Sequence, residues 1–218
     1  MIDTYPDTLA LIEIHTAYAN NVPWGTMRGG VYQAGWTPFD CQDGLQDAWP
    51  INTYESKFLT RQAIPTDVTI DMIVFCGGDT CQVRATVCIE SGGAGKTMEV
   101  WMAQVLDHFG PANFDRNMVQ NGSNGVEITL AADECATVTE TIVLNSDSLA
   151  SPENIKFFAW AQTTDYVYDP NVQYIGGTWY GAWFGEIYQG SKALQPFEGL
   201  FTDGFESGES TSWSSTTP

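Results

Sequence analysis

The sequence predicts an α+β, mostly β protein, in which a short α/β unit over residues 1–65 precedes an antiparallel β-sandwich over residues 66–196. Three observations carry this prediction. An apolar run near the start is typical of a strand buried on both faces, apolar and polar residues alternate through the middle of the chain, and turn-forming Gly, Asn and Asp separate the runs. Residues 197–218, which are acidic, rich in Gly, Ser and Thr and without periodicity, are predicted to be a flexible tail.

The front unit is assigned two strands and two helices. A nearly continuous apolar run over residues 8–16 predicts the first strand, and a proline-containing run over 36–41 predicts the second. Short helices are predicted over 26–33 and over 52–62, where apolar residues recur at helical spacing. Pro65 marks the predicted boundary with the sandwich.

Seven strands are predicted for the sandwich, because apolar and polar residues alternate with a period of two. Seven strands in about 120 residues match the scale of an immunoglobulin-like sandwich, although the strand order cannot be read from the pattern. The predicted strands span residues 68–74, 83–89, 97–107, 125–130, 136–144, 155–163 and 178–189.

The five cysteines predict two disulfides and one free thiol. Cys76 and Cys81 bracket a Gly-rich tip between two strand runs, which favours a hairpin closed by a disulfide. Cys88 leaves that hairpin and Cys135 adjoins a later strand, so these two are the second predicted pair, and Cys41 is left over. Disulfides persist in oxidising compartments, so an extracytoplasmic protein is predicted: secreted, periplasmic or at the cell surface. Five buried free thiols in a reducing cell are the alternative.

The charge balance limits the partners. With 8 Lys and Arg against 27 Asp and Glu, the formal net charge is -19, and such a surface repels nucleic acid and anionic membranes. No apolar run approaches the roughly 18 residues of a membrane helix, so membrane insertion is not expected. The first residues lack the pattern of a signal peptide, which we expect to have been removed or truncated. The charge balance is compatible with a protein or a polysaccharide as the partner.

No catalytic residue and no cofactor are predicted, because the chain contains no nucleophile elbow, no P-loop and no His-Glu-x-x-His motif. The protein is therefore expected not to be an enzyme. His15 and His108 each end an apolar run, and with Asp107 they are weak candidates for a metal site. Structural histidines with satisfied hydrogen bonds are the favoured interpretation.

An aromatic run over residues 166–188 is a candidate carbohydrate-binding surface. Trp179, Trp183, Tyr174 and Tyr180 carry flat rings of the kind that stack on sugar faces. The favoured alternative is that alternate aromatics fill the sandwich core. Trp179 and Trp183 fall on one strand face while Tyr180 and Phe184 fall on the other, so at least one of these sets is expected to pack inward.

The order of several short motifs resembles that of a known family. The motifs are Tyr5-Pro6-Asp7 leading into Ala10-Leu-Ile-Glu-Ile-His15-Thr16, then Tyr32-Gln-Ala-Gly-Trp36-Thr37-Pro38, Val105-Leu106-Asp107-His108, and the stretch from Asn154 to Gln162. This order resembles the Omp28-related family of bacterial extracytoplasmic proteins, in which a thioredoxin-like domain is followed by a β-sandwich. The resemblance implies that residues 1–65 are a thioredoxin-like α/β unit and that Pro38 matches the cis-proline of that fold. A simple turn proline is the alternative for Pro38.

The thioredoxin-like unit implied by the resemblance is expected to lack its first βα unit, by truncation, by a late start codon or by genuine loss, since no Cys-x-x-Cys occurs and the chain before residue 9 is too short for that unit. We therefore expect a secreted or surface-associated binding or structural protein without thiol-disulfide activity. A carbohydrate-binding module and a fragment of an extracytoplasmic thiol-disulfide oxidoreductase are the alternatives. Exposed edges of an incomplete sheet would also allow self-association.

Overall fold

The computed structural model describes residues 3–5, 12, 22–32, 44, 54–109 and 116–194. Within these residues the protein is mostly β, with strands that pair antiparallel throughout. The helices are α1 (Pro23–Tyr32), α2 (Tyr54–Gln62), α3 (Ser146–Ala150) and the 3-10 helix η3 (Pro152–Asn154). The strands are β1 (Val68–Gly77), β2 (Thr80–Ile89), β3 (Lys96–Leu106), β4 (Met118–Gly122), β5 (Val126–Leu130), β6 (Cys135–Val143), β7 (Ile155–Thr163), β8 (Val167–Ile175), β9 (Thr178–Phe184) and β10 (Ile187–Leu194).

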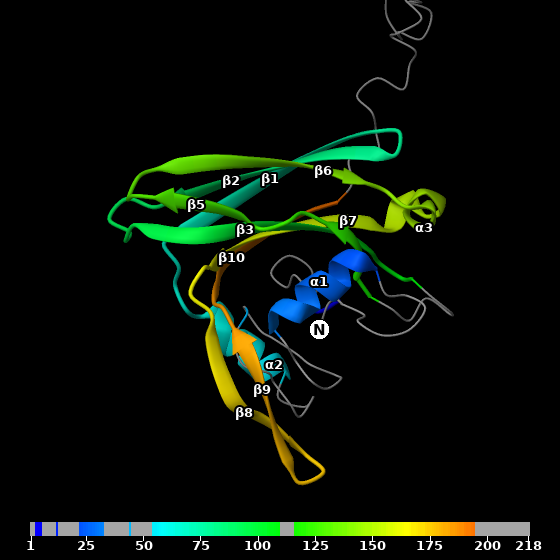
Figure 1. The fold of residues 1–218 in the computed structure, drawn as a ribbon. Coiled ribbons are helices and arrows are strands. Elements are labelled where there is room, and N and C mark those ends of the chain that lie inside the picture. Colours follow the sequence, from blue (N-terminus) through cyan, green and yellow to red (C-terminus); the bar gives the residue numbers. More distant parts are fainter. Residues whose placement is uncertain are drawn as a thin grey trace, which may run out of the picture.

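Two sheets lie face to face, and a separate hairpin extends from them (Figure 1). The smaller sheet has the order β1-β2-β6, and the larger has the order β10-β7-β3-β4. β5 also pairs with β3, along residues 96–100, whereas β4 pairs with residues 103–106 of the same strand edge. β8 and β9 pair with each other in a third, two-stranded sheet. This arrangement confirms the mostly β prediction and is consistent with a β-sandwich.

The sandwich core forms because alternate residues of each strand point inward. Val83, Ala85 and Val87 of β2 are fully buried and belong to the same cluster as Met98 and Met102 of β3. Full burial of each valine or methionine side chain in this cluster stabilises the fold by roughly 1.5–3 kcal/mol. The residues between them on β2 are more exposed, so the period of two predicted from the sequence is confirmed in β2.

The larger sheet is buried on its second face too, because α1 packs against it. Trp24 of α1 lies edge-on to Trp160 of β7, with ring centroids 6.4 Å apart, and its indole Nε1 donates to the carbonyl of Ser123 at 2.7 Å. Trp101 of β3 and Phe158 of β7 belong to the same cluster. Burial on both faces explains why β3 and β7 are nearly continuous apolar runs and do not alternate.

One predicted strand is wrong. The run over residues 178–189 forms two strands, β9 in the separate hairpin and β10 at the edge of the larger sheet. The chain changes direction at Gly185, whose amide donates to the carbonyl of Gly44 at 2.9 Å. A Cβ at Gly185 would lie 2.8 Å from the Tyr166 ring, so only glycine allows this close approach. With β4 and β8, which were not predicted, ten strands are present in the described residues instead of seven.

The front unit is described in part. The two predicted helices are present as α1 and α2, and α1 begins at Pro23, a residue that favours the first helical turn. The predicted strands over 8–16 and 36–41 lie outside the described residues except for Ile12, and so do His15, Pro38, Cys41 and the tail over 197–218. The thioredoxin-like unit and the two domain boundaries therefore stay predictions.

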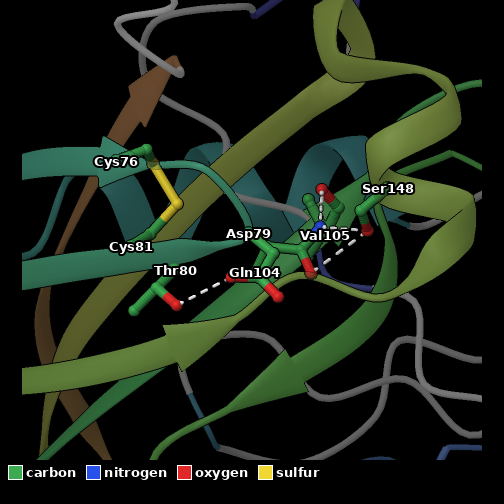
Figure 2. Close-up of a disulfide and its surroundings, with 7 residues drawn as sticks. All are labelled: Cys76, Asp79, Thr80, Cys81, Gln104, Val105 and Ser148. Carbon is green, nitrogen blue, oxygen red and sulfur yellow. Dashed lines mark hydrogen bonds between the residues drawn. A yellow bond between two sulfur atoms is a disulfide. The ribbon is translucent and has the colours of Figure 1, made fainter.

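Both predicted disulfides are present. Cys76 pairs with Cys81 and Cys88 with Cys135, at Cα separations of 4.0 and 4.1 Å, and each pair is directly opposed in an antiparallel register. Figure 2 shows the first of them closing the β1–β2 hairpin beside its turn. Two disulfides indicate a non-cytoplasmic environment. Within the described ranges, no helix is long and apolar enough to cross a membrane.

Candidate binding site

The β8–β9 hairpin is the part of the described structure that stands apart from the sandwich (Figure 1). Its turn is formed by Gly176 and Gly177, with φ of 58° and 91°. Two consecutive positive φ values produce the type I′ geometry that matches the twist of a tight hairpin, and glycine adopts it without strain. A register shift between Asp169 and Gln173 inserts a bulge into β8.

The pairing register places several aromatic residues on one face of this hairpin. Tyr168 lies opposite Trp183 and Tyr174 lies opposite Trp179, and Trp179 and Trp183 share a face because they are four residues apart on one strand. Tyr168 and Trp183 contact each other, with ring centroids 5.2 Å apart and a tilt of 46°. We call Tyr168, Trp179 and Trp183 the aromatic face.

The rings of the aromatic face are accessible. Trp179 is 54% exposed and Tyr168 is 48% exposed, while Trp183 is half-buried. Gly181 lies between the two tryptophans, and a Cβ there would be 2.3 Å from the hydroxyl of Tyr168. The Tyr168 ring therefore lies across the backbone of Gly181. The result is a row of flat apolar surfaces on a short projecting element.

The opposite face of the hairpin packs inward. Ala182 and Phe184 of β9 are buried together with Val172 of β8 in a small cluster of their own. The expectation that one of the two aromatic sets packs inward is confirmed for Phe184. These residues form a cluster apart from the sandwich core, whereas Tyr188, at the end of the aromatic run, packs against that core. Tyr180, opposite Gln173, is 36% exposed.

Asp107 lies in a buried cluster of charges and not at the aromatic face. Its carboxylate accepts hydrogen bonds from Arg116 Nε and from Lys156 Nζ, each at 2.6 Å. Burial would raise the pKa of Asp107, but the hydrogen bonds and positive charges of Arg116 and Lys156 outweigh it and hold that pKa far below its usual value. His108 Nε2 is 3.8 Å from the same carboxylate.

These contacts give Asp107 a structural role, because two cations already occupy both of its oxygens. Among the residues that the structure describes, no group of three or more His, Cys, Asp or Glu side chains is placed to hold a metal ion. His15, the other histidine considered for a metal site, lies outside those residues.

The sequence interpretation did not identify Arg28, a buried cation at the base of the hairpin. Arg28 is 1% exposed and stacks between Trp101 and Trp160, with its guanidinium carbon 4.2 and 5.5 Å from the two ring centroids. Its position in α1 carries no recognisable motif. The available signal was the scarcity of Lys and Arg: with eight such residues in the chain, each is a candidate for a specific contact.

The chain matches no protein-family model and no curated protein sequence. Among solved structures, it is similar to HBP35 of Porphyromonas gingivalis, with a TM-score of 0.47, 11% identity and coverage of 64% of this chain and 45% of that one. It is also similar to Spo0M, a sporulation control protein from Bacillus subtilis, with a TM-score of 0.34, 11% identity and coverage of 57% and 49%. The chain thus spans less than half of each of these structures, and at these scores the likenesses decide nothing about its function.

Proposed function

We propose that this chain is an extracytoplasmic binding protein whose aromatic face binds a polysaccharide. The observation that carries the proposal is the exposure of Trp179 and Tyr168 on a hairpin that lies outside the sandwich. Large exposed aromatic rings are costly in water unless they meet a partner, and the apolar faces of sugar rings stack well on indole and phenol rings. Trp183, in contact with Tyr168, extends the same surface.

Charge narrows the class of polysaccharide. The net charge of -19 disfavours uronic-acid or sulfated polymers, because two negative surfaces repel each other. We therefore propose a neutral glycan. The two disulfides support a location outside the cytoplasm, where such polymers are found. Thiol-disulfide exchange is not part of the proposal, since the four cysteines that the structure describes are paired with each other across strands.

Affinity electrophoresis tests the proposal directly. The native protein is run through gels that contain neutral soluble polymers, namely mixed-linkage β-glucan, galactomannan and arabinoxylan, and through a gel that contains polygalacturonate. We expect retardation by at least one neutral polymer and none by polygalacturonate. Trp179→Ala should weaken retardation about tenfold, because a ring contact contributes roughly 0.5–1.5 kcal/mol beyond its buried area.

Phe75→Ala is the matched control. Phe75 is 54% exposed, as Trp179 is, but it lies on the outer face of β1 and away from the hairpin. The control should be retarded like the native protein. Absence of retardation of the native protein in all three neutral gels, or equal retardation of Trp179→Ala and the native protein, would overturn the proposal.

A further inference from the structure

The aromatic hairpin joins the sandwich at two points, and one buried side chain is connected to both. Tyr166 precedes β8 and Gly185 follows β9. The Arg28 guanidinium of α1 donates to the Tyr166 hydroxyl at 3.4 Å and to Gln162 Oε1. Gln162 is fully buried, and its Nε2 donates to the carbonyl of Gly185. Arg28 thus reaches the start of the hairpin directly and its end through Gln162.

The surrounding rings fix the orientation of this guanidinium. It makes cation–π contacts with Trp101 of β3 and with Trp160 of β7, so rings from two strands hold the cation in place. Glu99 completes the arrangement, because its Oε2 accepts from Trp101 Nε1 at 3.0 Å and from the Tyr166 hydroxyl at 3.2 Å. A planar fork with fixed donors can hold two acceptors in a set geometry, which a lysine ammonium cannot do.

An ion pair at the hairpin base is more exposed than the Arg28 contacts. Arg61 of α2 lies 3.2 Å from Glu186, next to Gly185, and the Glu186 side chain is about half exposed. Exposed pairs of this kind contribute little to stability, whereas hydrogen bonds to a buried cation are about twice as strong as neutral ones. Of these two side-chain attachments, the Arg28 contacts are therefore expected to be the stronger.

We propose that Arg28 is a positioning residue for the aromatic hairpin, so that docking of α1 sets how the aromatic face is presented. In this view α1 does more than cover the second face of the larger sheet. It supplies the cation that holds the two ends of the hairpin together. The consequence for binding rests on the proposed function, but the mechanical link between α1 and the hairpin does not depend on any ligand.

Amide hydrogen exchange tests the link without a ligand. Arg28→Met retains an unbranched side chain and removes its charge and donors, and Tyr166→Phe removes only the hydroxyl, which accepts from Arg28 and donates to Glu99. Ser148→Ala is the control, because it removes a buried hydrogen bond to Gln104 at 3.1 Å on α3, away from the hairpin (Figures 1 and 2).

We expect exchange over residues 167–184 to rise about tenfold in Tyr166→Phe and by more in Arg28→Met, relative to β2 of the same variant. Ser148→Ala should leave the ratio of hairpin to β2 exchange at its native value. An unchanged ratio in Tyr166→Phe, or an equal rise in Ser148→Ala, would overturn the inference, and Tyr166→Phe decides the matter if Arg28→Met does not fold.

Polysaccharide retardation of Tyr166→Phe separates this inference from the proposed function. Faster hairpin exchange together with weaker retardation supports both. Faster hairpin exchange in a protein whose native form is never retarded would leave the positioning role of Arg28 standing and overturn the proposed function alone.

Discussion

Arg116 Nε lies 2.6 Å from Oδ1 of Asp107, and this pair joins the end of β3 to the start of β4. Lys156 of β7 binds the other oxygen of the same carboxylate, and Arg116 reaches on to Asp3 at 3.1 Å. Asp107 is 4% exposed, and its buried negative charge joins β7 and the start of β4 to the end of β3. Arg116 extends this link to Asp3.

Asp107→Asn should destabilise the protein by about 2–3 kcal/mol at neutral pH, because it leaves two cations without their buried partner. Chemical denaturation measures this loss. Asp71→Asn, which removes an exposed carboxylate from β1, is the control and should change the free energy of unfolding by less than about 0.5 kcal/mol. Equal effects of the two substitutions would contradict the structural role of Asp107.

The same carboxylate predicts how stability depends on pH. The pKa of Asp107 is lowered in the folded protein, so its contribution is complete above the usual aspartate pKa of about 3.9 and is lost as the pH falls below it. The free energy of unfolding of the native protein should therefore decrease below about pH 4. Asp107→Asn should show a shallower decrease in the same range, and a parallel decrease in both proteins would contradict the assignment.

The two disulfides should contribute unequally to stability. Their sequence separations are 5 and 47 residues, and a crosslink that closes a longer loop removes more entropy from the unfolded chain. We expect the Cys88→Ala/Cys135→Ala double variant to lose about 4 kcal/mol and the Cys76→Ala/Cys81→Ala double variant about 2 kcal/mol. Thermal unfolding of each double variant under non-reducing conditions checks the order, and the reverse order would contradict it.

Gly122 should be essential for seating α1. A Cβ at Gly122 would lie 2.4 Å from the Trp24 ring and 2.7 Å from the carbonyl of Met102. Gly122→Ala should therefore push Trp24 away and cost about 1–3 kcal/mol of unfolding free energy, with a change in the near-ultraviolet circular dichroism of tryptophan. Gly77→Ala is the control, since a Cβ there has no neighbour within 4 Å. Similar effects at both positions would argue against close packing of Trp24 on Gly122.

Local signals allowed much of the sandwich to be predicted. Alternation in β1 and β2 follows directly from one buried and one exposed face, and the cysteines stand beside a hairpin tip or on neighbouring strands. The continuous burial of β3 and β7 departs from the predicted alternation, because α1 covers the second face of the larger sheet.

The aromatic run was identified from the sequence, but the separate hairpin that it forms and the contacts at the base of that hairpin were not. Residues 178–189 have one uninterrupted aromatic pattern, and the change of direction at Gly185 depends on contacts with Gly44 and Tyr166, which lie far away along the chain or across the hairpin. Arg28 is surrounded by Trp101, Trp160 and Gln162, all distant in sequence. Tertiary packing alone defines such a site, so neither periodicity nor residue spacing could indicate it.

The two disulfides both involve β2, which is tied to β1 through Cys81 and to β6 through Cys88. A protease that cuts the peptide chain once, anywhere between Glu90 and Glu134, would therefore yield two fragments that stay covalently joined through Cys88 and Cys135. The nicked molecule would keep β6 beside β2 with its register intact. In a non-cytoplasmic environment that contains proteases, this crosslink would hold the two parts of the sandwich together after the first cleavage of the backbone.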